Sequence, residues 1–182
     1  MSLEVRGLLT MSFMNAIDLL KKQHEKVKKV LTRMSNGAPA TSEELRNLAD
    51  ELVAHMVIEE HIFYPRVKEI VKDMVSESFE EHAVARFELA RLLQATGTEK
   101  KTRALVLKEL IEHHVKEEEE DMFEKVKKEV PEDELVRLGE KMEGAFERAV
   151  EKGFAAFFPT TASPGRNRRH TNGSSVSMHH AR

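Results

Sequence analysis

The chain has 182 residues, the length of one ordinary domain, and its 40% apolar content is enough for a hydrophobic core. Its net charge of -3 gives no general attraction to nucleic acids or anionic membranes, so neither is an expected partner. Because the chain contains no cysteine, disulfides, thiolate metal ligands and a cysteine nucleophile are excluded, and the cytoplasm is the simplest compartment for it.

The residue types favour helices, because Gly and Pro are few, Trp is absent and Tyr occurs once. Residues 1–13 form an expected N-terminal extension, whose apolar run is too short for a typical signal peptide. Five periodic segments follow, at about residues 14–34, 41–75, 76–96, 98–130 and 131–157. The second opens with a capping-box pattern from Thr41 to Glu44. Short connections predict an all-α fold, an antiparallel up-down-up-down four-helix bundle with an additional C-terminal helix.

The helical periodicity ends near Phe158, so the predicted bundle domain spans residues 14–158. Residues 159–182 are rich in Ser, Thr, Gly, Asn and Arg, and we expect them to be a disordered tail or vector-derived residues. The chain contains no apolar run that approaches the ~20 residues needed to cross a bilayer, which excludes an integral membrane protein.

Each of the first four predicted helices carries one histidine within its apolar stripe. The four are His24, His55, His82 and His114, and the second and fourth are followed one turn later by Glu59 and Glu118. The stripe of the third helix is predicted as Phe79, His82, Arg86, Leu89 and Leu93. Alone, each histidine is more simply a hydrogen-bonded core residue, and each His-x-x-x-Glu pair a surface ion pair. A bundle brings all six groups into one interior, which would be prohibitively polar without a cation, so the sequence predicts a buried metal site.

The types of ligand restrict the metal and the number of ions. Imidazoles with carboxylates and no sulfur suit iron, manganese or zinc, and six side chains are too many for one tetrahedral zinc ion. Two octahedral ions offer about twelve positions, of which two bridging glutamates and four histidines fill about eight. The remaining positions are left for a bridging oxygen and exogenous ligands, so a dinuclear centre with open coordination is expected. The ferritin-like alternative is disfavoured, because it requires a Glu-x-x-His motif that this chain lacks.

The order and spacing of these residues resemble a hemerythrin-like (HHE cation-binding) domain. After His24, the resemblance is carried by HMVIEEHIFYP from His55, EEH ending at His82 and HHVKEEEEDMF from His113, across about residues 14–130. It implies two iron ions in a non-haem, oxo- or hydroxo-bridged di-iron centre. The implied terminal ligands are His24, His55, His82 and His114, and the implied bridges are Glu59 and Glu118.

The resemblance leaves three functions open as hypotheses. The first is a protein that binds or senses oxygen or a related small ligand such as nitric oxide or peroxide. The second is a di-iron redox enzyme acting on peroxide or oxygen, and the third is an iron-holding or structural bundle. The expected partner is therefore a small diatomic or peroxide ligand.

Two positions depart from the pattern of the oxygen carriers. Arg86 stands where those carriers have a second histidine on the third helix, and its side chain would either donate hydrogen bonds to bound peroxide or extend outward. The carriers also end with a five-residue step from histidine to aspartate. In this chain the run HHVKEEEE permits His114 with Glu118, His114 with Glu119, or His113 with Glu118, and the register of the stripe favours the first pair.

Neighbouring residues are expected to serve packing or to face solvent. His61 lies about 240° around the helix from His55, so it should point away from the site, as should Glu60. Tyr64 is near the site in sequence and could neighbour the metals, but packing is its expected role. The apolar side of the fifth helix would cap the bundle or form a dimer contact, so a monomer and a homodimer both remain open; its residues are Phe146, Phe154, Phe157 and Phe158.

Overall fold

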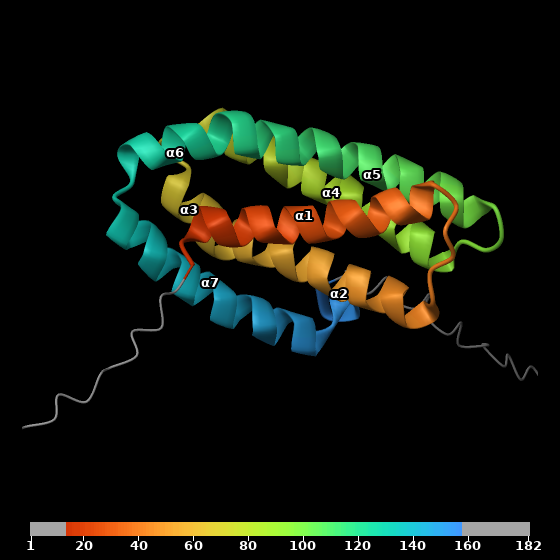
Figure 1. The fold of residues 1–182 in the computed structure, drawn as a ribbon. Helices are drawn as coiled ribbons and strands as arrows, with labels where there is room; N and C mark the ends of the chain where they lie inside the picture. Colours follow the sequence, from red (N-terminus) through yellow and green to blue (C-terminus); the bar gives the residue numbers. More distant parts are fainter. Residues whose placement is uncertain (1–13, 158–182) are drawn as a thin grey trace, which may run out of the picture.

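The computed structural model describes residues 14–157, which are helical and include no strand (Figure 1). Four long helices form the bundle: α1 (Ala16–Ser35), α2 (Ser42–Ile58), α4 (Lys72–Gln94) and α5 (Glu99–Glu117). Helix α1 packs against α2 and α5, and α4 packs against the same two helices. Consecutive helices run in opposite directions, which confirms the predicted all-α antiparallel bundle.

The ends of the predicted domain are only partly covered by the structure. The expected extension of residues 1–13 and the expected tail of residues 159–182, together with Phe158, lie outside the described residues. Among the helices of residues 14–157, a stretch with the length and hydropathy of a membrane span does not occur. The division of the chain into extension, bundle and tail therefore stays a prediction.

Local sequence signals explain where the first two helices begin. Asn15 caps α1, because its side-chain oxygen accepts a hydrogen bond from the amide of Asp18 at 2.9 Å. The predicted capping box of α2 is confirmed: Thr41 accepts from the amide of Glu44, and the Glu44 carboxylate accepts from the amide of Thr41. Between these helices Gly37 adopts a φ of 90°, a conformation that glycine reaches without strain.

Two of the predicted helices contain a π-helical turn that the periodicity did not predict. Turn η1 (Glu59–Phe63) continues α2 into α3 (Tyr64–Val67), and η2 (Glu118–Met122) continues α5 into α6 (Phe123–Glu129). After each turn, the amide of Tyr64 or Phe123 donates to the carbonyl five residues earlier. One extra residue is thereby accommodated in each helix, as is frequent at functional sites.

The boundary between the second and third predicted helices was wrong. The prediction put it at residues 75 and 76, whereas α3 ends at Val67 and α4 begins at Lys72. The amides of Ile70 and Val71 both donate to the carbonyl of Val67, which closes a tight turn. Ile70 and Val71 also pack in the core. Because this turn contains neither glycine nor proline and is partly apolar, the sequence carries no breaker signal there.

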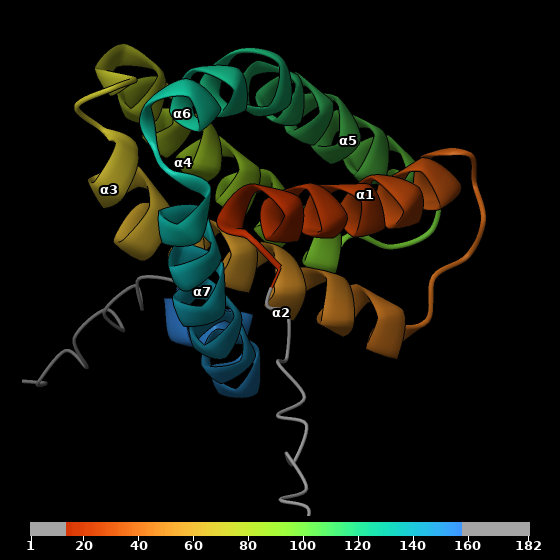
Figure 2. The same cartoon turned by 60° about the vertical axis from the view of Figure 1, so that its left-hand side comes forward.

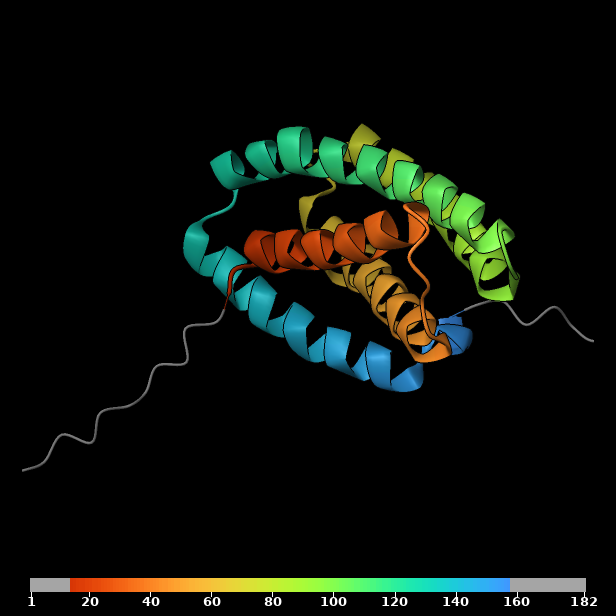
Figure 3. The same ribbon diagram turned by 45° about the vertical axis from the view of Figure 1, so that its right-hand side comes forward.

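The additional helix α7 (Glu132–Lys152) lies along α1 and α2 on the outside of the bundle (Figures 2 and 3). Its Gly139 meets the start of α1 so closely that a Cβ atom there would lie 2.1 Å from the carbonyl oxygen of Met14. Phe146 on α7, and Phe154 and Phe157 in the short helix η3 (Phe154–Phe157), are partly buried against the core. This packing agrees with the capping alternative.

The core is divided into two apolar clusters, and the predicted polar residues lie between them. One cluster is built around Phe63 and Phe123, and the other around Leu52 and Leu89. One predicted core position was wrong, because Phe79 is 41% exposed. The buried side of α4 runs instead through Val75, Ser78, His82, Ala85, Leu89 and Leu92. A layer that contains carboxylates therefore lies between the two apolar clusters of the bundle.

Candidate metal centre

The structure brings all six predicted site residues together in this central layer. Each bundle helix contributes one histidine, and each π-turn contributes the glutamate with which it begins; the residues are His24, His55, His82, His114, Glu59 and Glu118. Every one of these residues is at most 4% exposed. Helical spacing explains the grouping, since His55 and Glu59, like His114 and Glu118, are four residues apart on one face.

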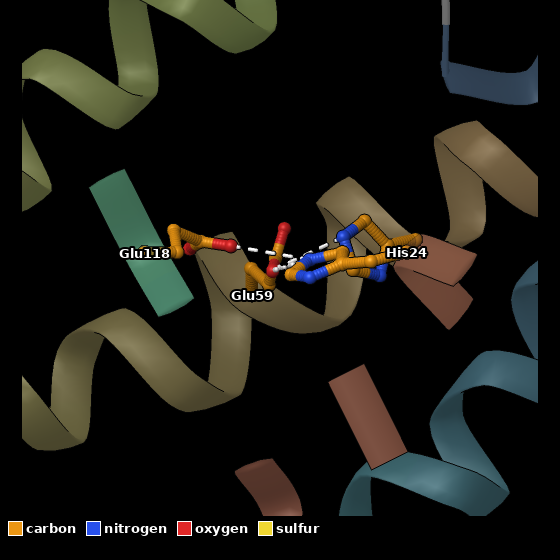
Figure 4. A group of neighbouring side chains, drawn as sticks. His24, Glu59 and Glu118 are labelled. Atoms are coloured by element: carbon orange, nitrogen blue, oxygen red, sulfur yellow. Dashed lines mark ion pairs between the residues drawn. The ribbon is translucent and has the colours of Figure 1, made fainter. Parts of the chain in front are cut away.

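The ring nitrogens Nε2 and the carboxylate oxygens point toward one another. The two oxygens of Glu59 face different histidines, with Oε1 3.1 Å from Nε2 of His55 and Oε2 3.3 Å from Nε2 of His82. Oε2 of Glu118 lies 3.2 Å from Nε2 of His24 and 3.5 Å from Nε2 of His114. Figure 4 shows the imidazole of His24 directed at the carboxylates of Glu59 and Glu118.

Several of these atoms are buried without a hydrogen-bond partner within the described part of the chain: His24 Nε2, both oxygens of Glu59 and Oε2 of Glu118. Such a group costs free energy unless a cation or a proton compensates it. The Nε2 atoms of His82 and His114 lie 3.2 Å apart. Two ligand atoms bound about 2.1 Å from one ion are separated by roughly 3 Å, so the spacing fits shared coordination. The residues present therefore fit metal ions.

The other ring nitrogen of each histidine is hydrogen-bonded to an outer partner. The four Nδ1 pairs are His24 with Glu119 (2.9 Å), His55 with Gln23 (2.8 Å), His82 with Glu60 (2.9 Å) and His114 with Glu81 (2.7 Å). An Nδ1–H that donates to its partner leaves the Nε2 lone pair free to bind a cation. All four imidazoles are thus oriented as metal ligands, three by carboxylates and one by a neutral amide.

Sequence reasoning missed these outer partners. Glu60 was predicted to have no part in the site, but it orients His82 and also accepts a hydrogen bond from Nη1 of Arg86 at 2.8 Å. Arg86 therefore supports a histidine through Glu60, a role that neither predicted alternative included. His61 is exposed, as predicted, and its Nδ1 lies 3.0 Å from the carbonyl oxygen of Val57.

Packing was the expected role of Tyr64, and a place beside the metals was the alternative. The structure supports the alternative, because Tyr64 is fully buried and its hydroxyl donates to Oε1 of Glu118 at 2.9 Å. The same hydroxyl lies 3.4 Å from Nε2 of His82. Burial and the carboxylates of Glu118 and Glu59 raise the pKa of Tyr64 well above its usual value, so the phenol keeps its proton. The signal that could have revealed this role is its place five residues after Glu59, one π-helical turn away.

The carboxylates in the layer also change the pKa values of the histidines. Burial alone would lower the pKa of His24, but Glu118, Glu119 and Glu59 outweigh it and hold that pKa well above the usual value. Burial is likewise outweighed at His82, where Glu59 and Glu60 raise the pKa to about 9. At His55 burial prevails and lowers the pKa. In the metal-free protein, protons on His24 and His82 thus supply part of the positive charge that metal ions would otherwise bring to the carboxylates.

The sequence left three histidine–glutamate pairs open at the end of the fourth predicted helix, and their positions in the structure distinguish them. His114 and Glu118 point into the layer, whereas Glu119 is 25% exposed and hydrogen-bonded to Nδ1 of His24. His113 is 63% exposed and lies outside the layer. The pair favoured by the stripe is the one that the structure brings to the centre.

A small cavity adjoins the histidines on the side away from Tyr64. Its volume is about 10 Å³, which is room for about one water molecule. It is lined by the four histidines and by Gln23, Val27, Leu52, Met56, Ile111 and Val115. A group bound here would meet the rings of the four histidines on one side and apolar side chains on the other.

Comparisons with known proteins agree with this geometry. The family model described as hemerythrin HHE cation binding domain matches residues 15–126. The uncharacterized protein Rv2633c of Mycobacterium tuberculosis is 33% identical over 144 residues, a match covering 74% of this chain and 87% of the relative. The uncharacterized protein Mb2666c of Mycobacterium bovis matches with the same identity and coverage.

A solved structure is also similar. It is the crystal structure of a hemerythrin HHE cation binding domain-containing protein from Mycobacterium kansasii, described as a homolog of Rv2633c. The TM-score is 0.62 at 30% sequence identity, and the match covers 76% of this chain and 89% of that chain.

Proposed function

Since the chain belongs to the hemerythrin HHE cation-binding domain family, we propose that its buried residues hold two iron ions that bind or sense a small ligand. The ligand class is dioxygen, nitric oxide or peroxide. The observation that carries the proposal is the set of buried, unpartnered oxygen and nitrogen atoms that converge in the central layer. Bound iron would supply redox chemistry and open coordination positions at this point.

The geometry supports a division of the ligands between two ions. Two groups of ligand atoms lie close enough to share an ion: His24, His55, Glu59 and Glu118 in one, and Glu59, His82 and His114 in the other. Glu59 belongs to both groups and directs one oxygen at each, so it suits a bridge. The second group has fewer protein ligands, which leaves more positions for an exogenous molecule.

The small cavity supports a ligand of two or three atoms. A space with room for about one water molecule favours a small ligand over a bulky organic substrate, and its apolar walls favour an uncharged diatomic. The first test of the proposal is elemental analysis of purified protein, which should give about two iron ions per chain.

Removal of a single ligand should lower that iron content sharply. We expect His55→Ala and Glu59→Ala to lose most bound iron, because each removes a ligand and Glu59 serves both groups. His61→Ala, which removes an exposed histidine from the same helical segment, is the matched control and should keep its iron. Full iron occupancy in both ligand variants would refute the assignment of the site.

A redox enzyme acting on peroxide or oxygen is the second candidate. It is favoured by Tyr64, whose protonated hydroxyl donates to the carboxylate of Glu118 and lies close to His82, so that it can hold a proton at the centre. Reduced, iron-loaded protein should be mixed with oxygen and separately with peroxide. A spectral change that reverses when oxygen is removed supports binding, many turnovers of peroxide per chain support the enzyme, and no response supports an iron-holding bundle.

A further inference from the structure

A second group of metal-ligating side chains lies outside the central layer, where α4 packs against α5. Glu81 comes from α4, and His113 and Glu117 come from consecutive turns of α5. Nε2 of His113 lies 3.5 Å from Oε1 of Glu81 and 3.5 Å from Oε1 of Glu117. Two carboxylates from different helices thus converge on one imidazole nitrogen.

The distances fit coordination better than hydrogen bonding. An N–H···O hydrogen bond typically spans about 2.7 to 3.2 Å, so 3.5 Å is long for either carboxylate. Ligand atoms about 2.1 Å from a tetrahedral ion are separated by roughly 3.4 Å, which is close to the spacing seen. One imidazole and two carboxylates are ligands that suit zinc, iron(II) or manganese(II).

The group lies at the mouth of a groove that leads toward the central layer. The groove has a volume of about 250 Å³ and is bordered by Glu77, Glu80, Glu81 and His113. Its lining also includes His82 and His114, which belong to the central layer. A groove bordered by three carboxylates raises the local concentration of cations.

Glu81 connects the two groups directly. Its Oε1 faces His113, while its Oε2 accepts a hydrogen bond from Nδ1 of His114 at 2.7 Å. An ion held by the outer group would therefore be one carboxylate and one imidazole away from the central layer. This shared carboxylate gives such an ion a short path inward.

We propose that Glu81, His113 and Glu117 form an outer site for a divalent transition-metal ion, and that this site supplies the central metal centre. The supply role rests on the proposed function, whereas binding at the outer site does not. His113 and Glu117 are 63% and 37% exposed, so the ion can be captured from solvent with little rearrangement.

Titration of the metal-free protein with Co²⁺ tests both parts, because its visible absorption differs between coordination geometries. The wild type should bind three ions per chain, two in the centre and one outside. His113→Ala and Glu117→Gln should weaken the outer ion by at least about tenfold and leave the two inner ions in place. Glu112→Gln, which removes an exposed carboxylate of α5 outside the group, is the control and should keep three.

The rate of inner loading tests the supply role. At limiting Co²⁺, His113→Ala should fill the inner centre about tenfold more slowly than wild type while reaching the same final content. Equal rates in wild type and His113→Ala would overturn the supply role, and two ions in the wild type that are both retained in His113→Ala would overturn the outer site. A wild type that binds only one ion, lost in His113→Ala, would keep the outer site and refute the metal centre.

Discussion

At the scale of single residues, Tyr64 links packing to the chemistry of the site. We expect Tyr64→Phe to weaken metal binding by about 10- to 100-fold, because the change keeps the ring and removes the only donor to Oε1 of Glu118 among the described residues. Competition with a coloured chelator would measure the affinity. An unchanged affinity would show that this hydroxyl does not support the carboxylate.

A matched variant separates the hydroxyl from the ring. Phe79 packs edge-on against Tyr64 with the ring centres 5.6 Å apart, and its own side chain is 41% exposed. Phe79→Leu disturbs that ring contact and leaves the hydrogen bond to Glu118 in place. It should therefore retain metal affinity, which attributes the effect of Tyr64→Phe to the hydroxyl.

The raised pKa values of two histidines predict how metal binding depends on pH. At neutral pH the metal-free protein holds protons on His82, with a pKa of about 9, and on His24, whose pKa is also well above its usual value. A metal ion must displace these protons, so its apparent affinity should rise between pH 7 and pH 9. The expected gain is about tenfold per pH unit for each proton displaced.

Calorimetric titration with Zn²⁺ in buffers of different ionisation enthalpy would count the released protons directly. About two protons per chain at pH 7 are expected, and fewer at pH 9. Proton release that is absent at pH 7 would contradict the assignment of protonated His24 and His82 to the metal-free state.

At the scale of helices, the two π-turns give the site its form. Each follows the pattern His-x-x-x-Glu-x-x-x-x-aromatic, once from His55 to Tyr64 and once from His114 to Phe123. In a regular α-helix the aromatic residue would lie about 140° away from the glutamate. The extra residue of the π-turn returns it to the buried face.

This feature also marks the limit of prediction from sequence. The stripes predicted the four helices and the inward histidines, because α-helical spacing holds as far as Glu59 and Glu118. Beyond those residues the register changes: regular α-helical spacing from Glu59 would bury Ile62, whereas Phe63 and Tyr64 are the fully buried residues. A π-turn leaves no residue type that reports it, and the periodicity therefore could not predict it.

The outer partners could not be predicted for a related reason. Each of these partners is next to a predicted ligand in the sequence, as Gln23, Glu60 and Glu81 show. The surrounding runs are rich in charged residues, so the sequence does not distinguish one carboxylate from another. Which of them reaches an Nδ1 atom depends on how neighbouring helices are rotated. That rotation is set by packing across the bundle, which a single sequence does not report.

The contact between α7 and α1 can be tested at Gly139. A Cβ atom there would overlap the backbone of Met14 and Asn15, which cannot give way as a flexible side chain would. Gly139→Ala should therefore lower the free energy of unfolding by about 1 to 3 kcal/mol, measured by urea denaturation.

Gly144→Ala on the same helix is the control. Its added Cβ would meet only the end of the Arg148 side chain, at 3.3 Å. Because alanine favours a helix interior more than glycine does, this variant should be stabilised by about 0.5 to 1 kcal/mol. Destabilisation of both variants to the same extent would refute a specific contact at Gly139.

At the scale of the whole molecule, bound ions would join all four bundle helices through one layer. Removal of metal with a chelator should therefore lower the melting temperature. The expected decrease is roughly 10 °C if the free metal concentration in the loaded sample is about a thousandfold above the Kd. Helical content should persist, because the apolar clusters on both sides of the layer do not depend on the ions. Circular dichroism melts of loaded and chelated protein would measure both quantities.

The same chelated protein should lose stability at high pH. The pKa of His82 is about 9 in the folded chain and near 6.5 when unfolded, so its contribution is fully present below pH 6.5 and lost as the pH rises through 9. The loaded protein should not show this loss, since ions replace the protons. A chelated protein that is equally stable at pH 6.5 and pH 9.5 would contradict this account.

The repeated halves of the site are alike in backbone but not in chemistry. The residue that follows the first π-turn is a tyrosine, which offers a hydroxyl to Glu118. Its counterpart Phe123 offers only a ring face, stacked on His24 with the ring centres 6.1 Å apart. The centre is therefore polarised along the line between these two aromatic residues. The two ions would therefore differ in their surroundings, so a ligand without symmetry, such as nitric oxide or a hydroperoxide, would bind between them in a preferred direction.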